Sequence, residues 1–390
     1  MNVLFVTYDF PYPTNSGGKN RAYHLIKHTA SKANIFLFSF VRDDYNPEHN
    51  EELIKIGIKG IKVVKRKKLS SFSNFPKTLL HNSSIFKTLY FSKDILQDIE
   101  DFIKKEKIDV VHFESSYTGY YIGKELKKLG VRQVLGTENI EFRLYFDYAK
   151  SFKKPIVRPF ISYQANRLKN EELGMVVGAD SVTTITQEEA DFLKVLTKVT
   201  SSVVANGIEP STYSYKYDRS IKKNILFVGN FSYFPNVEAV EFFYNEAFPK
   251  LRDDITLTII GKNCKDKFHF EDKRIIMKDF VEDIITEYRN ADALVFPIRI
   301  GGGTNFKVLE AMSLGVPIIA QPERLSGLRA VPGEHFLSAI TGQEYAEQIN
   351  VLYADGKLRE KLAVNARTLI DKYYSWEKIG QSLLNVWTSQ

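Results

Sequence analysis

A glycine-rich segment near residue 300 has the residue types and spacing of a phosphate-binding loop. It reads Pro297-Ile-Arg-Ile-Gly-Gly-Gly-Thr-Asn-Phe-Lys-Val-Leu-Glu310 and follows a short apolar run over 292–296. The glycines lead into an amphipathic stretch that begins near Thr304, so backbone N–H groups would point outward at the positive end of a helix dipole. Because glycine has no Cβ atom, a diphosphate can approach this backbone closely.

Charged side chains flank the glycines. Lys307 falls one helical turn in, on the side facing such a ligand, and Arg299 adds a second cation. Glu310 lies three residues past Lys307, roughly on the same face, where its carboxylate could accept hydrogen bonds from ribose hydroxyls. The alternative is a strand-to-helix turn with a surface Lys307–Glu310 pair, but a turn needs fewer than three glycines. The segment therefore favours a diphosphate site.

A second glycine pair, Gly17-Gly18, follows the first apolar run and would also precede a helix. On its own it is equally consistent with a flexible connection. It matches neither the G-x-G-x-x-G dinucleotide pattern nor a P-loop lysine motif, which argues against a dehydrogenase or an NTPase.

Composition bounds the remaining possibilities. The chain has 390 residues, 44% hydrophobic and 26% charged, as in a soluble protein of two or three domains. The single cysteine, Cys264, excludes an intramolecular disulfide and a cysteine-built zinc site. The N-terminus lacks the pattern of a signal peptide, and no apolar run is long enough to span a bilayer. We expect a cytoplasmic protein.

The positive charge is concentrated in the first half. Residues 1–205 hold 31 Lys and Arg against 23 Asp and Glu, whereas the remainder holds 23 against 24. The excess includes a basic cluster formed by Lys59, Lys62, Lys65, Arg66, Lys67 and Lys68. Such a cluster attracts polyanions or anionic lipid headgroups, so it could bring the protein to the inner face of the cell membrane; it could equally be a solvated surface. No recognition motif for nucleic acid accompanies it.

Short β-branched or aromatic runs alternate with stretches of helical periodicity. In the first half the predicted strands are 2–6, 34–40, 60–64, 109–113, 131–135, 181–185 and 202–204. In the second half they are 224–228, 256–260, 274–277, 291–296 and 316–320. Predicted helices include 20–30, 93–105, 117–129, 237–247, 281–289, 305–314 and 344–352, and 139–178 reads as helical with a break near Pro155 and Pro159.

This alternation predicts an α/β protein with two doubly wound, Rossmann-like domains. The polar, turn-rich stretch 206–223 is the best candidate linker. The predicted domains are 1–205, with a C-terminal helix 375–390 packing back on it, and 206–374. Ligands are expected in a cleft at the carboxyl ends of the strands.

The C-terminal half resembles retaining glycosyltransferases of family 4, which have the GT-B architecture. The resemblance runs through Phe227-Val-Gly-Asn-Phe-Ser-Tyr-Phe-Pro-Asn236, Leu257-Thr-Ile-Ile-Gly261, Asp279-Phe-Val-Glu-Asp283, the segment 291–312 and Gly315-Val-Pro317. The first half matches more loosely, through Pro13-x₃-Gly17-Gly18-x₂-Arg21 and Asp109-Val-Val-His112. Similarity is greatest over residues 224–320.

The resemblance implies a nucleotide-sugar donor bound by the C-terminal domain. The residues implied for donor binding are Gly17, Gly18, Lys262, Phe280, Val281, Gly301, Gly302, Gly303, Thr304 and Asn305. Lys307 and Arg299 would carry the charge of the departing diphosphate, and Glu310 would bind the ribose. Transfer with retention needs no protein nucleophile, because a donor phosphate oxygen takes the acceptor proton. Neither a cofactor nor a metal is implied.

Three positions depart from the family pattern. The first of two glutamates separated by seven residues is replaced by Gly302, as in a three-glycine subgroup. The arginine and lysine that usually follow the first strand of the C-terminal domain are absent. Lys307, Arg299 and Lys262 are then the cations that could stabilise the charge of the leaving diphosphate. Where a second histidine often stands two residues after His112, this chain has Glu114.

His112, Glu114, Glu138 and Asn139 are therefore candidates on the acceptor side. His112 could instead be a core histidine with satisfied hydrogen bonds, and Glu138-Asn139 could cap the following helix. The expected activity is transfer of a hexose or N-acetylhexosamine to a glycan, lipid-linked or protein acceptor, in the synthesis of cell-surface polysaccharide or glycoconjugates. The alternatives are a GT-B nucleotide-sugar epimerase and a non-catalytic GT-B binding subunit.

Overall fold

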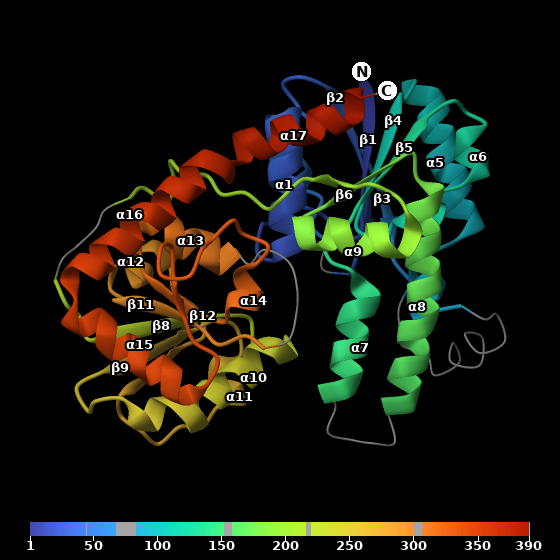
Figure 1. Ribbon diagram of the computed structural model, residues 1–390. Helices are drawn as coiled ribbons and strands as arrows, with labels where there is room; N and C mark the ends of the chain where they lie inside the picture. The colour runs from blue at the N-terminus through green and yellow to red at the C-terminus, as the bar shows by residue number, and fades with distance from the viewer. Residues whose placement is uncertain (44, 68–82, 152–157, 216–219, 300–305, 390) are drawn as a thin grey trace. The chain divides into compact units, whose positions relative to one another are not determined.

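The computed structural model describes residues 1–43, 45–67, 83–151, 158–215, 220–299 and 306–389 (Figure 1). The chain forms two compact units. Unit 1 comprises Met1–Ala205 and Trp376–Gln390, and unit 2 comprises Asn206–Ser375. Each unit is a parallel sheet with helices, so the predicted α/β fold class is confirmed.

The sheet of unit 1 has the strand order β3-β2-β1-β4-β5-β6-β7, and every pair is parallel. Its strands are β1 (Asn2–Thr7), β2 (Asn34–Val41), β3 (Gly60–Lys65), β4 (Val110–Glu114), β5 (Arg132–Gly136), β6 (Ser181–Thr184) and β7 (Ser202–Val203). The central strands are almost entirely buried and mostly apolar, as expected for a parallel sheet that helices cover on both faces, and β4 also carries the buried His112 and Glu114.

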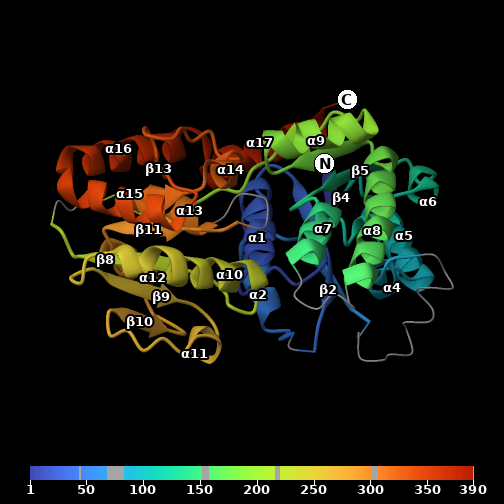
Figure 2. The ribbon, with the colours of Figure 1, turned by 60° about the horizontal axis from the view of Figure 1, so that its bottom comes forward.

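Unit 1 holds helices from both ends of the chain. They are α1 (Gly17–Thr29), α2 (His49–Lys55), α4 (Ile85–Tyr90), α5 (Lys93–Glu106), η2 (Gly119–Tyr121), α6 (Lys124–Lys127), α7 (Glu141–Ser151), α8 (Arg158–Gly178), α9 (Gln187–Thr197) and α17 (Trp376–Thr388). Helix α17 packs along α1, where Gly380 lets the two backbones approach next to His28. Helices α7 and α8 lie side by side (Figures 1 and 2).

Unit 2 repeats the arrangement, with the strand order β10-β9-β8-β11-β12-β13. Its strands are β8 (Asn224–Val228), β9 (Thr256–Ile260), β10 (Ile275–Lys278), β11 (Ala293–Phe296), β12 (Ile318–Ala320) and β13 (Leu337–Ser338). Its helices are α10 (Phe234–Phe242), η3 (Phe243–Ala247), η4 (Phe248–Lys250), α11 (Cys264–Lys267), α12 (Ile284–Arg289), α13 (Phe306–Leu314), α14 (Pro322–Leu325), α15 (Gly342–Ala354) and α16 (Gly356–Tyr373).

The strand orders locate the ligand-binding edge of each sheet. In unit 1 the direction of winding reverses between β1 and β4, and in unit 2 it reverses between β8 and β11. Open parallel sheets bind ligands at the carboxyl ends of the strands that flank such a reversal.

Two details differ from the sequence prediction. The single helix expected over 117–129 is wrong: a 3-10 turn ends at Tyr121 and α6 begins at Lys124. The cause is tertiary, because the Gln133 side chain bonds both the N–H and the C=O of Gly123 and holds that residue extended. The short edge strand β13 has no signal in the sequence. Within the described residues, none of the helices is long and apolar enough to cross a membrane.

Candidate functional site

Polar side chains gather at the carboxyl end of the unit 1 sheet around a buried ion pair. The Arg21 Nε donates to Glu114 Oε1 at 2.6 Å, and His112 Nε2 lies 2.7 Å from Glu114 Oε2. Arg21 also donates to the Ala205 carbonyl. All three side chains are almost fully buried. Burial alone would raise the pKa of Glu114, but Arg21 and His112 outweigh it and lower that pKa to about 2.

His112 is bonded at both ring nitrogens. The indole Nε1 of Trp387 in α17 donates to His112 Nδ1 at 3.3 Å, which places the ring proton on Nε2, facing Glu114. Gly136, at the end of β5, makes room for this pair, since a Cβ atom there would lie 2.7 Å from Glu114 and 3.0 Å from His112. His112 and Glu114 therefore form a hydrogen-bonded network with Arg21 and Trp387 inside unit 1.

Glu138 differs from Glu114 because one of its oxygens has no partner. Tyr8 donates its hydroxyl to Glu138 Oε2 at 3.2 Å, while Oε1 is buried without a hydrogen bond in the described part of the chain. Both oxygens lie close to Gly18, whose missing Cβ would come within 3.0 Å of them. Burial and the nearby Glu114 raise the pKa of Glu138 to about 8.

Helix α7 receives its N-terminal cap from α8. The Glu172 carboxylate accepts the backbone N–H groups of Glu141 at 3.2 Å and Phe142 at 3.1 Å, together with the Ser116 hydroxyl at 2.6 Å. Asn139, two residues before the helix, forms a side-chain hydrogen bond with Glu141. Burial raises the pKa of both Glu141 and Glu172 to about 7.

This collection of carboxyls predicts an unusual pH dependence for unit 1. Burial raises the pKa of Glu138 to about 8 and those of Glu141, Glu172 and Glu189 to about 7, against about 4.3 in an unfolded chain. The folded state thus favours their neutral forms. Their contribution to stability is complete below the unfolded pKa and is lost as pH rises through about 7 to 8. Glu114 acts oppositely, and its contribution is lost as pH falls from about 4.5 towards about 2.

We expect unit 1 to melt several degrees lower at about pH 8.5 than at about pH 5.5. Tryptophan fluorescence reports this transition, because both tryptophans, Trp376 and Trp387, belong to unit 1. The variant Glu138→Gln removes one titrating group and should reduce the difference in melting temperature between the two pH values. A melting temperature that climbs with pH across this interval would contradict the assignment.

In unit 2, residues 300–305 fall outside the described structure. The predicted donor-binding residues among them are Gly301, Gly302, Gly303, Thr304 and Asn305. The structure describes the chain on both sides of them. Strand β11 ends at Phe296 and α13 begins at Phe306, so the segment connects a central strand to the N-terminus of a helix. Lys307 and Glu310 both belong to the first turns of that helix.

Lys307 lies in an aromatic cage. Its Nζ donates to the Asn236 Oδ1 at 2.9 Å and lies over the rings of Phe227, at 4.6 Å, and Phe296, at 5.3 Å. Burial lowers the pKa of Lys307 to about 7, an effect that the charge of Glu310 reduces. The described contacts of the Lys307 amine are therefore one amide oxygen and two aromatic rings.

Glu310 is fixed by two phenols. Tyr288 donates to its Oε2 at 2.8 Å and Tyr213 donates to its Oε1 at 3.1 Å. Burial raises the pKa of Glu310, and the two hydroxyls and Lys307 partly offset it. Each carboxylate oxygen keeps a second lone pair, so Glu310 can still accept a hydrogen bond from a ligand hydroxyl.

The other predicted donor-site residues are placed differently. Arg299 already forms an ion pair with Glu238 and stacks on Phe242 at 4.3 Å, so binding a diphosphate would require that pair to open. Lys262 is exposed just beyond β9. Phe280, just past β10, is 80% exposed, and Val281 beside it is half-buried. An exposed aromatic ring at the carboxyl end of a sheet offers a stacking surface for a nucleotide base.

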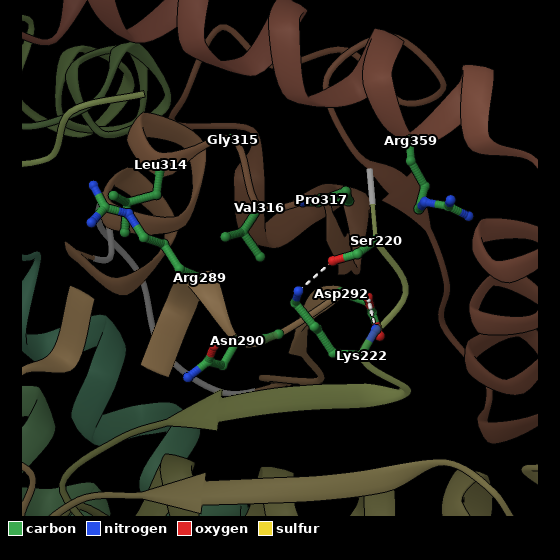
Figure 3. A pocket seen from close by; sticks show the side chains of 11 residues that line it. Ser220, Lys222, Arg289, Asn290, Asp292, Leu314, Gly315, Val316, Pro317 and Arg359 are labelled. Atoms are coloured by element: carbon green, nitrogen blue, oxygen red, sulfur yellow. Dashed lines mark hydrogen bonds between the residues drawn. The ribbon is translucent and has the colours of Figure 1, made fainter. Parts of the chain in front are cut away.

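A cavity of about 210 Å³ lies at the opposite, amino end of the unit 2 strands. Figure 3 shows its two arginines, Arg289 and Arg359, at opposite sides with their guanidinium groups pointing apart. Asp292 accepts the backbone N–H groups of Lys222 and Asn224, which ties the start of β8 to β11. These contacts anchor the chain that enters the sheet.

The basic cluster in unit 1 is partly neutralised. Lys62 pairs with Asp98 at 3.3 Å and Lys65 with Asp43 at 2.6 Å, both at the surface. Arg66 donates to the Tyr90 hydroxyl and lies over its ring. Lys68 falls outside the described residues.

Several partners in these sites are not expected from the sequence. Tyr8, Tyr213, Asn236, Tyr288 and Trp387 each bond a candidate residue from a distant position in the chain. Asn236 does fall inside the Phe227–Asn236 motif, and that position is the one signal that could have identified it.

Comparisons with known proteins address the fold of the chain and one of its domains. Residues 222–355 match the model of the family described as Glycosyl transferases group 1. No curated protein matches the chain. Among solved structures, a sucrose-phosphate synthase from Thermosynechococcus elongatus has a TM-score of 0.73 at 15% identity, over 99% of this chain and 98% of that one.

Two further structures extend the likeness. HepE of Anabaena, solved with UDP, has a TM-score of 0.70 at 13% identity, over the whole of both chains. The lipopolysaccharide outer core galactosyltransferase WaaB, in its apo form, has a TM-score of 0.64 at 17% identity, over 99% of each chain. At these identities the likeness shows the fold. The chain therefore has the GT-B fold, and its residues 222–355 carry a domain that matches the glycosyl transferases group 1 family.

Proposed function

We propose that this protein is a glycosyltransferase that moves a sugar from a nucleoside-diphosphate sugar to a hydroxyl group of a glycan, lipid-linked or protein acceptor, with retention at the anomeric carbon. The observation that carries the proposal is the pair of Lys307 and Glu310 in the first turns of α13, inside the domain that matches the family. A half-buried cation and a carboxylate fixed by two hydroxyl groups suit the diphosphate and the ribose of one donor.

The proposed chemistry asks the protein mainly to stabilise charge. When the bond between the sugar and the diphosphate breaks, negative charge grows on the leaving phosphate. Lys307 and the N-terminal end of α13 oppose that charge in a desolvated setting, where electrostatic stabilisation is strongest. A phosphate oxygen of the donor accepts the acceptor proton, so no nucleophile from the protein is required.

Unit 1 would contribute the acceptor side. Glu138 is suited to a sugar hydroxyl because its Oε1 is without a partner in the described residues. With its pKa raised to about 8, mainly by burial, the carboxyl is largely protonated near neutral pH and can both donate and accept a hydrogen bond. Arg21, Glu114 and His112 would hold the surrounding chain in place.

The test is a panel of nucleoside-diphosphate sugars incubated with the purified protein. UDP-glucose is the natural first member, because HepE of Anabaena was solved with it. We expect slow release of the nucleoside diphosphate with one donor, and a rise in melting temperature of unit 2 with that donor and its product.

The panel also separates the alternatives. Binding of a donor without release of its nucleoside diphosphate, in the presence of acceptor extracts, would favour a non-catalytic GT-B subunit. The ion pair between Arg299 and Glu238 would then be one reason for the lack of turnover. Conversion of the donor to a second nucleotide sugar would favour an epimerase. If no donor shifts the melting temperature, the proposal is wrong.

A further inference from the structure

The Lys307 amine is held by a neutral group and by aromatic rings. Its polar partner is the Asn236 side-chain oxygen, at 2.9 Å, and the rings of Phe227 and Phe296 cover it. An amide oxygen can accept a hydrogen bond from either an amine or an ammonium group, and unlike a carboxylate it adds no charge of its own. The contact therefore fixes where the nitrogen lies without fixing whether it is charged.

Asn236 is itself rigidly oriented. It lies in the first turn of α10, directly after Pro235, and its Nδ2 donates to the Asn230 carbonyl at 2.9 Å. That bond leaves only Oδ1 to face Lys307. Gly229 keeps the space open, because a Cβ atom there would lie 2.8 Å from the Asn236 amide carbon.

The charged groups around the cage are already occupied. Glu310, on the same helix as Lys307, receives hydrogen bonds from Tyr288 on α12 and from Tyr213. Helix α10 carries two carboxylates: Glu238 pairs with Arg299, and Glu241 is exposed at the surface. Among the described residues, Lys307 thus forms no ion pair, and its pKa is lowered to about 7, primarily by burial.

We propose that Asn236 is a positioning residue that holds Lys307 as a reserve cation, and that a nucleoside diphosphate bound beside α13 draws a proton from solvent onto the Lys307 amine. The inference rests on the proposed function and adds to it. Two or more negative charges arriving within a few ångströms favour the ammonium form strongly. When the nucleoside diphosphate leaves, the proton returns to solvent and the amine returns to Asn236.

The experiment measures protons taken up on binding. UDP, or whichever nucleoside diphosphate the donor panel identifies, is titrated calorimetrically at about pH 8.5 in two buffers of different ionisation enthalpy. At that pH phosphate is fully ionised, since its second pKa is about 6. The wild-type protein should take up close to one proton per UDP bound, because an amine of pKa about 7 is almost wholly neutral there.

The decisive variant is Asn236→Asp, which has the same shape and adds a carboxylate beside the amine. Lys307 should then be protonated before UDP arrives, so proton uptake should fall to roughly a fifth of a proton or less. If residue 236 did not hold the Lys307 amine, the added carboxylate would leave the uptake near one proton. Lys307→Met, which keeps the cage filled, should abolish uptake while weaker UDP binding persists.

The outcomes separate the inference from the function. UDP binding to the wild-type protein without proton uptake would overturn the inference and leave the proposed function standing. Unchanged uptake in folded Asn236→Asp would also overturn it, and far-ultraviolet circular dichroism establishes that this variant is folded. If no nucleoside diphosphate binds the wild-type protein, the proposed function itself fails.

Discussion

Replacing Lys307 with alanine should lower turnover of the donor by roughly 10²- to 10³-fold, the effect of removing one group that stabilises developing charge in a buried site. The expected loss of turnover is large because, among the described residues, neither of the other predicted cations is placed to replace the Lys307 charge. Arg299 is paired with Glu238, and Lys262 is exposed at the end of another strand. The measurement is steady-state release of nucleoside diphosphate at saturating donor.

Two companion variants make this result specific. Lys307→Met keeps the space between Phe227 and Phe296 filled, so a similar loss would exclude a collapsed cage as its cause. Lys357→Ala changes an exposed lysine in the first turn of α16 and should leave turnover unaltered. Wild-type turnover in folded Lys307→Ala would show that the diphosphate is held elsewhere.

Replacing Arg21 with methionine should destabilise unit 1 by about 3–5 kcal/mol, the usual cost of leaving one member of a buried ion pair without its partner. Glu114 is 1% exposed and would lose its closest cation, while the Ala205 carbonyl would lose a donor. Urea unfolding followed by tryptophan fluorescence measures the change. Lys27→Met, on the exposed face of the same helix, is the control and should have little effect.

The double variant Arg21→Met/Glu114→Gln tests the cause. Removing both charges should recover much of the stability lost in the single variant, because the penalty comes from the unpaired carboxylate. If the double variant is no more stable than Arg21→Met, packing of the arginine side chain accounts for the loss instead.

The architecture was predictable because hydrophobic runs record burial directly. Every strand expected from such a run is present. The parallel direction of the strands follows from the alternation of strands and helices. The helix boundaries were less predictable where one distant side chain decides them. Gln133 interrupts the helix expected over 117–129 by bonding Gly123, ten residues earlier in the sequence.

For the candidate sites, only residues close to one another in the sequence could be predicted together. Lys307 and Glu310 could be recognised from their spacing behind three glycines, whereas their partners come from far away. Asn236 is 71 residues from Lys307, and Tyr213, within the stretch read as a linker, is 97 residues from Glu310. Spacing within one helix shows which side chains share a face, but it contains no information on what packs against that face.

The contact between Trp387 and His112 also bears on how the chain folds as it is made. Residues 376–390 leave the ribosome only after all of unit 2, yet they complete the buried network of unit 1. Domains synthesised first ordinarily fold first. Here the second unit can finish folding while the first still lacks α17, the helix that covers His112. A nascent unit 1 therefore exposes the surface of α1 on which α17 packs for the whole time that unit 2 is translated.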